Sequence, residues 1–279
     1  MSGFSAEWLA LREPADHRAR NPDLLAATSR LFAGRQAIDI LDLGSGSGSN
    51  VRGLADHLPA RQSWRLVDYD PHLIAAAKGS LAGWADRSRE NGTLQLERKE
   101  RTVDIAFQQA DLSRDLDSVL DPQPDLVTAA AFFDLVSEEW LDRFAAALAA
   151  RKLPLYTVLI YDGRESWMPP HPLDHALNAA FNQHQHQDKG FGPAAGPDAA
   201  GILAKALRDR GYEVVLGDSP WRLTQNDLAL ITPLADGIAQ AVRETGTLRS
   251  REVDLWREFH RLPDACTIGH TDLLAIPPR

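Results

Sequence analysis

The sequence predicts an α/β protein whose doubly wound, mostly parallel sheet carries helices on both faces and an added lid. Short apolar runs rich in β-branched residues alternate with segments whose apolar residues recur at helical spacing, as in sheets of this kind. Seven of the runs predict strands, at residues 38–43, 64–68, 103–109, 124–130, 155–161, 212–216 and 267–276. Residues 164–197 are too many for a plain strand-to-helix connection, so we expect a lid or binding loop there.

Composition and charge limit the partners that the chain can have. Its 279 residues are 44% apolar and 25% charged, which suits one large globular α/β domain. The net charge of −9 argues against a general DNA or RNA binder, which needs a basic face. No apolar run approaches the ~20 residues that span a bilayer, and the N-terminus lacks a signal-peptide pattern. The single Cys266 excludes an internal disulfide, so we expect a cytoplasmic protein. The sequence leaves open whether the chain forms a homo-oligomer.

The glycine-rich turn after the first predicted strand is the strongest functional signal. It reads Asp42-Leu43-Gly44-Ser45-Gly46-Ser47-Gly48 and leads into a helix. Such a turn aims free backbone N–H groups and a helix N-terminus at a ligand. A dinucleotide site prefers G-x-G-x-x-G/A, and Ser49 stands where the last small residue belongs. The turn is therefore a poor match to a dinucleotide site.

The same turn resembles motif I of the class I S-adenosylmethionine (SAM)-dependent methyltransferases, in which an acidic residue stands two positions before G-x-G-x-G. The resemblance implies that SAM binds across the ends of the first two strands, with its methionine part against the glycines. It also implies that the last two strands form an antiparallel pair at the end of the sheet. The cofactor contacts expected in the turn are Asp42, Gly44, Ser45, Gly46 and Gly48.

Further cofactor contacts are expected at the ends of the next three strands. Asp68, followed by Tyr69, ends the second strand, where a carboxylate can accept hydrogen bonds from both ribose hydroxyls. Asp70 and Pro71 after it suit the N-cap and first turn of a helix. By the resemblance, Asp111 and Leu112 contact the adenine, and the strand that contains Ala129 ends beside the transferred methyl group.

The N-terminal segment, residues 1–36, is expected to be helical and to serve as a lid, as such segments often do in the resembled family. Its first helix, around Trp8, Leu9 and Leu11, is expected to break near Pro14. Residues 37–279 then form the methyltransferase domain, with residues 164–197 as a second lid. Residues 86–102 are expected to form a charged, hairpin-like excursion before the third strand.

The predicted lid at residues 164–197 contains four histidines. We predict that His184 and His186 lie near the acceptor, that one of them is the general base, and that Asp188 orients it. The alternative is a solvated polar loop. No metal site is predicted, because Pro172 interrupts the His171/His175 pair and no cysteine is near. Acids after the fourth and fifth strands hold a divalent cation in some methyltransferases of small diols, and Asp134 and Asp162 stand at similar positions.

These observations predict SAM-dependent methyl transfer to an oxygen or nitrogen of a small or medium-sized molecule held beneath the two lids. Methyl transfer is an in-line displacement, so the protein chiefly aligns the reactants and excludes water. Two alternatives stay open at this point. One is an NAD(P)-dependent oxidoreductase, and the other is a SAM-binding partner subunit that does not catalyse.

Overall fold

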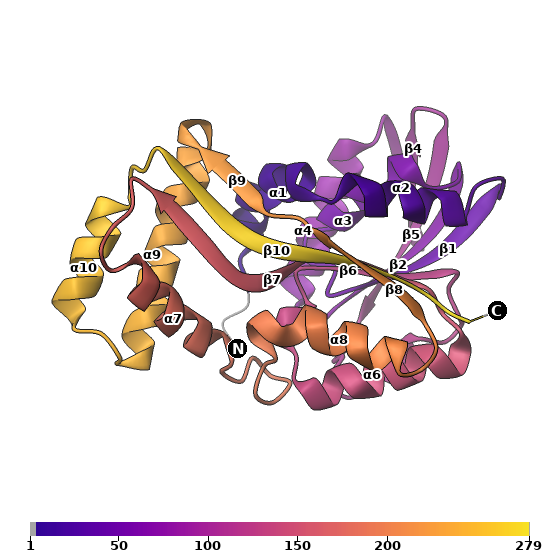
Figure 1. Cartoon of the computed structure of the whole chain (residues 1–279). Helices are drawn as coiled ribbons and strands as arrows, with labels where there is room; N and C mark the ends of the chain where they lie inside the picture. Colours follow the sequence, from indigo (N-terminus) through magenta and orange to yellow (C-terminus); the bar gives the residue numbers. More distant parts are fainter. Residues whose placement is uncertain (1–3, 279) are drawn as a thin grey trace.

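A computed structural model describes residues 4–278, which form one ten-stranded sheet covered by helices on both faces (Figure 1). The strands are β1 (Ala37–Leu43), β2 (Arg61–Asp68), β3 (Arg87–Asn91), β4 (Thr93–Arg98), β5 (Arg101–Gln109), β6 (Leu126–Ala130), β7 (Leu155–Met168), β8 (Glu213–Asp218), β9 (Trp221–Thr224) and β10 (Ala265–Ile276). The helices are α1 (Ala6–Ala19), α2 (Pro22–Leu31), α3 (Ser49–Leu54), α4 (Pro71–Trp84), α5 (Leu116–Val119), α6 (Glu138–Arg151), α7 (Asp174–Gln185), α8 (Ala199–Arg208), α9 (Leu228–Thr245) and α10 (Ser250–Phe259).

The strand order is β3-β4-β5-β2-β1-β6-β7-β10-β8, and β9 pairs with β10 outside this path. Strands β5, β2, β1, β6 and β7 are parallel, whereas β10 is antiparallel to both of its neighbours. The doubly wound sheet and its antiparallel last strand are therefore confirmed. The expected number of seven strands is wrong: β3 and β4 extend one edge, and β9 adds a short strand beside β10.

The two faces of the sheet bury separate sets of side chains. Ile38, Ile40 and Trp64 face one way and pack with residues of α2, α3 and α4. Leu41, Leu43 and their neighbours face the other way and pack with α6 and α8, which lie beneath the sheet in Figure 1. Because β1 is covered on both faces, its sequence is a nearly continuous apolar run, as expected for a central parallel strand.

Strands β7 and β10 continue beyond the parallel sheet and, with β9, form an extension covered by α7, α9 and α10 (Figure 1). Trp167 of β7 meets Trp256 of α10 there, with ring centroids 5.3 Å apart. Residues 164–197 are therefore not one long loop as expected. The strand runs to Met168, and Leu177 and Ala180 bury one face of α7, so the irregular parts are residues 169–173 and 186–195.

The expected helix break near Pro14 is also wrong, because α1 runs through this proline from Ala6 to Ala19. Arg12 and Asp16 form a buried ion pair across it, with Arg12 Nε 2.9 Å from Asp16 Oδ2. Glu13 accepts two hydrogen bonds from Arg52 of α3. These contacts hold both halves of α1 in place. No helix within residues 4–278 is both long and apolar enough to cross a membrane.

Candidate functional site

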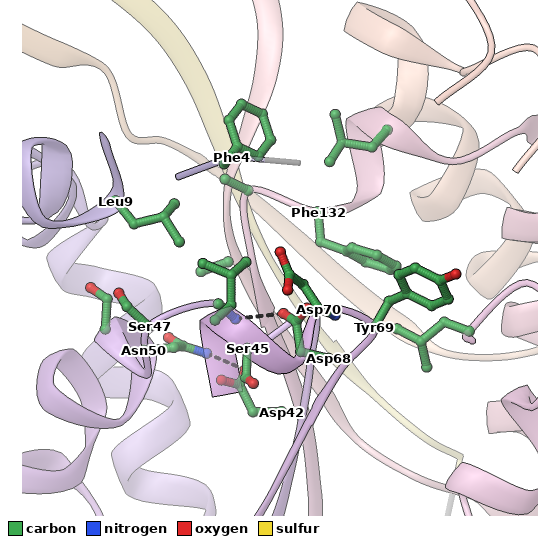
Figure 2. Close-up of a pocket in the computed structure, with 18 of the residues that line it drawn as sticks. Phe4, Leu9, Asp42, Ser45, Ser47, Asn50, Asp68, Tyr69, Asp70 and Phe132 are labelled. Atoms are coloured by element: carbon green, nitrogen blue, oxygen red, sulfur yellow. Dashed lines mark hydrogen bonds between the residues drawn. The ribbon is translucent and has the colours of Figure 1, made fainter. Parts of the chain in front are cut away.

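A cavity of about 350 Å³ lies where β1, β2, β5 and β6 reach their carboxyl ends. Ligands of open α/β sheets bind at this edge, where the strand order reverses. The glycine turn forms one wall of the cavity, α1 contributes Leu9 and Arg12, and residues 130–132 form another wall. Figure 2 shows Phe4 and Leu9 on one side of the turn, and Tyr69 and Phe132 on the other.

The glycine turn owes its shape to backbone conformations that other residues rarely adopt. Gly44 and Gly46 have φ angles of 61° and 52°. The N–H of Gly46 donates to Asp68 Oδ2 at 2.8 Å, which ties the turn to the end of β2 (Figure 2). Gly48 is also required for packing, because a Cβ there would lie only 2.7 Å from Leu81 Cδ1 of α4. Glycine at this position lets α4 pack closely against the turn.

Asp68 is held by backbone donors on both of its oxygens. Oδ1 accepts from the N–H of Asp70 at 3.0 Å, and Oδ2 accepts from Gly46. Burial raises the pKa of the Asp68 carboxyl, although these hydrogen bonds act in the opposite direction. Asp70 accepts from the N–H of His72 and is the N-cap of α4, as expected.

Beneath the turn, Asn50 bridges the carboxyl group of Asp42 and the guanidinium of Arg20. Its Nδ2 donates to Asp42 Oδ1 at 2.8 Å, and its Oδ1 accepts from Arg20 Nη2 at 2.8 Å. Burial raises the pKa of Asp42 to about 7. Several buried polar atoms here have no hydrogen-bond partner among the described residues: Asp42 Oδ2, Arg20 Nε, Arg20 Nη1, Ser45 Oγ and Ser47 Oγ. All four side chains belong to the cavity lining. This end of the cavity is therefore polar and short of partners.

The other parts of the cavity are more apolar. Phe132 and Phe191 meet edge to face, with ring centroids 5.7 Å apart, and Leu135 and Leu159 lie in the same lining. Ala131 and Leu159 have left-handed backbones, with φ of 51° and 62°. Such strain in non-glycine residues persists only where the surroundings enforce it, and it is frequent at functional sites. The N–H of Leu159 is fixed by Asp272 Oδ1 at 2.8 Å, and that of Ala131 by the carbonyl of Val158.

No protein-family model matches the sequence, and no curated protein does either. Solved structures do match the fold. A protein of Bacillus halodurans C-125, described as a candidate methyltransferase, aligns over 91% of this chain and 99% of its own, with 12% identity and a TM-score of 0.51. The YcgJ protein of Bacillus subtilis aligns over 93% and 100%, with 13% identity and a TM-score of 0.50. This chain has the class I methyltransferase fold.

Within this methyltransferase fold, most of the predicted cofactor contacts line the cavity: Asp42, Gly44, Ser45, Gly46, Asp68, Tyr69, Asp111 and Leu112. Gly48 and Ala129 do not belong to the lining. Gly48 packs on Leu81, and Ala129 is buried in β6 just before the lining residues Ala130 and Ala131. Asp111 lines the cavity while its Oδ1 accepts from the N–H and hydroxyl of Ser113, and the latter bond lowers its pKa most.

The three predicted catalytic residues lie outside the cavity lining. His184 is in α7, where its Nε2 lies 3.0 Å from Glu244 Oε2 of α9. Nδ1 of His186 lies 3.1 Å from the carbonyl oxygen of Ala194. Asp188 Oδ1 accepts from the N–H groups of the two glycines that flank Phe191. The loop reaches the cavity through Gly190 and Phe191 instead, so the general-base role of the histidines stays a prediction without geometric support.

Two arginines of the site, Arg12 and Arg20, were not predicted. Both belong to the N-terminal segment, and both line the cavity. Arg12 stacks over the Trp221 ring at 4.8 Å and pairs with Asp16. The sequence feature that could have indicated Arg12 is its i, i+4 spacing from Asp16, which favours an ion pair on a helix. The rest of the segment has the composition of a charged connector.

Metal binding finds no support in the part of the chain from residue 4 to 278. No group of three or more His, Cys, Asp or Glu side chains there is arranged to hold an ion. Asp162 is engaged by Arg164, whose Nη2 lies 2.6 Å from Asp162 Oδ2. Asp134 is buried, which raises its pKa to about 6.

Proposed function

We propose that the protein is a SAM-dependent methyltransferase that acts on an oxygen or nitrogen of a small or medium-sized molecule. The observation that carries this proposal is the glycine turn fastened to Asp68 at the wall of a cavity, on a class I methyltransferase fold. The partnerless polar atoms at one end of the cavity support it further, because a ligand with a charged end supplies the partners that they lack.

The residues present fit each part of the cofactor. Backbone groups of Gly44 and Gly46, with Asp42 and Ser45 beside them, suit the methionine part. Asp68 and Tyr69 suit the ribose, since a carboxylate at this position can accept from two hydroxyls. Asp111 and Leu112 suit the adenine. Gly48 and Ala129 would support the site by packing and not by contact.

When bound, SAM supplies the methyl group from its sulfonium. The chain's own residues then have to orient the acceptor and keep water away. The apolar wall made by Phe132, Leu135 and Leu159 suits an acceptor with an apolar body. Helix α1 on one side, and Phe191 of the loop at residues 186–195 on the other, would act as covers. This arrangement favours a mechanism in which the protein only aligns the reactants. No general base is assigned, because His184 and His186 lie outside the cavity lining.

The decisive experiment is titration calorimetry with S-adenosylhomocysteine. Gly46→Val should abolish binding, because valine tolerates a φ of 52° poorly and a Cβ there already lies 3.0 Å from Leu9 Cδ1. Asp68→Ala should weaken binding by about 1–3 kcal/mol, as expected for lost hydrogen bonds to a charged group. Gly79→Ala is the matched control, since no atom lies within 4 Å of a Cβ at that position.

Unchanged affinity in both site variants would contradict the proposal. A thermal-shift comparison of S-adenosylhomocysteine with NADPH separates it from the oxidoreductase alternative, for which Ser49 is the wrong residue. A protein that binds the cofactor tightly but methylates nothing in a metabolite extract would favour the non-catalytic partner subunit.

A further inference from the structure

Helix α10 has apolar side chains on two of its faces. Val253 and Trp256 lie on the face that is buried in the extension, where α10 packs against α9. On another face, Leu255 and Phe259 are 56% and 44% exposed, and Leu262, in the turn after the helix, is 76% exposed. A helix with one buried apolar face normally presents polar and charged residues elsewhere. The second apolar face of α10 is therefore not explained by the packing of the described residues.

The exposed apolar residues lie together at the end of the extension, where α10 is the outermost helix in Figure 1. Leu255 and Phe259 are one helical turn apart, and Leu262 follows three positions later, so their side chains are neighbours. Met168, which is 57% exposed, ends β7 at the same place, where its carbonyl accepts from the N–H of Asp264. We call these four apolar residues the tip patch. Single exposed apolar residues are ordinary, but a group of them marks an interaction surface.

The charges beside the tip patch are complementary to themselves. Arg251 and Glu258 are both exposed and stand seven positions apart, which is two helical turns, so they flank the apolar face on the same side. Arg251 forms no ion pair within residues 4–278, and the ion pair of Glu258 there is a long one, 3.8 Å from Arg261 Nη1. A two-fold axis that packs α10 antiparallel against a second copy keeps this side and reverses the order of residues. Arg251 of each chain then faces Glu258 of the other.

We propose that the tip patch is the interface of a two-fold dimer with a second copy of this chain, in which the two α10 helices are antiparallel. Leu255 lies beside the axis, and the pair of Arg251 with Glu258 occurs once on each side of it. A parallel arrangement would instead place the two Arg251 side chains at the same level. A lipid surface is a poorer match, because helices that bind membranes carry a basic polar face, whereas Asp254 and Glu258 are among the exposed residues of α10. The inference does not depend on the proposed function.

Sedimentation equilibrium over a series of protein concentrations tests the dimer. Each chain contributes little more than one helix, so we expect a reversible dimer whose population rises with concentration. Leu255→Glu should raise the dissociation constant about tenfold or more, because it buries two like charges beside the axis. Leu31→Glu is the matched control, since Leu31 is another exposed leucine at a distant position, in α2, and its replacement should leave the constant unchanged. Thermal unfolding verifies that each variant is folded.

A charge exchange tests the antiparallel arrangement. Arg251→Glu and Glu258→Arg should each weaken the dimer about tenfold, because either change replaces two attractive pairs by two repulsive ones. The double variant should return the dissociation constant to near the wild-type value, since the pair is restored with its charges exchanged. A loss caused by local distortion of α10 would not be restored in this way.

Four outcomes would contradict the proposal. The first is a wild-type chain that stays monomeric at every concentration. The second is a dimer that Leu255→Glu leaves intact or that Leu31→Glu dissociates, because another surface would then hold it. The third is a double variant without recovery, which would exclude the antiparallel pairing. The fourth is flotation with anionic phospholipid vesicles of the wild type but not of Leu255→Glu, which would assign the tip patch to a lipid surface.

Discussion

Replacing Asp42 by asparagine should stabilise the protein at alkaline pH. The Asp42 side chain is buried beneath the glycine turn, and desolvation raises its pKa from 3.8 to about 7. Asn50 and the charge of Arg20 act in the opposite direction, but burial is the larger effect. A carboxyl whose pKa is higher in the folded chain binds more protons there than when unfolded. Stability is therefore lost as the pH rises from about 4 to about 7.

The size of the effect follows from the pKa. One pH unit of difference corresponds to 1.36 kcal/mol, so raising the pH from 5 to 8 should cost the wild-type folded state about 3 kcal/mol through Asp42. The asparagine side chain of the variant does not titrate, and its oxygen can still accept from Asn50. Its buried NH₂ group offsets part of the gain, by about 1–3 kcal/mol if it finds no partner. The pH dependence is thus a cleaner measure than stability at one pH.

Urea unfolding of both proteins at pH 5 and pH 8 provides that measure. The loss of unfolding free energy between the two pH values should be smaller in Asp42→Asn than in the wild type, by about 3 kcal/mol. Buried acids remote from Asp42 titrate in both proteins and cancel in this comparison, whereas Asp68, whose charge raises the pKa of Asp42, is coupled to it. Asp39→Asn, at an exposed position of the same strand, should leave the difference unchanged. Equal pH dependence in Asp42→Asn and wild type would refute the reasoning.

Two further predictions concern residues around the site. Trp221→Phe removes the indole N–H that donates to buried Asp16 at 3.0 Å, so the free energy of unfolding in urea should fall by about 1–3 kcal/mol; no change would mean that water replaces the bond. His184→Ala and His186→Ala should each keep wild-type affinity for S-adenosylhomocysteine and, once an acceptor is known, near wild-type turnover. A loss of about 10²-fold or more in kcat for one of them, with this affinity intact, would instead support a general base.

The sequence predicts the central sheet because its strands leave an unambiguous pattern. Strand β1 is a run of apolar residues that ends in a glycine turn, and burial on both faces requires that pattern. Strand β3 leaves none, because all five of its residues are exposed. Helix α7 leaves only a weak pattern, because Leu177 and Ala180 are its two buried residues and its last turn, before the C-cap His186, is polar.

The candidate site likewise contains residues that the sequence pattern predicts and residues that it does not. Its glycines and acids were found because each follows a strand at a position that the chain order defines. Arg20 and Asn50 were missed, because their significance depends on one contact between segments thirty positions apart. Pro14 was misread for a similar reason, since local propensity predicts a break and only the contacts of Arg12 and Glu13 override it.

The attachment of α1 to the extension also sets an order of events during synthesis. Asp16 receives its hydrogen bond from Trp221, which lies 205 positions later, and Arg18 pairs with Asp227. A nascent chain that ends before β9 already contains the glycine turn, Asp68, Asp111 and the Arg52 contact of α1, yet it lacks the two partners Trp221 and Asp227. The second set of contacts on this cover of the cavity therefore forms only after residues 221–227 have left the ribosome.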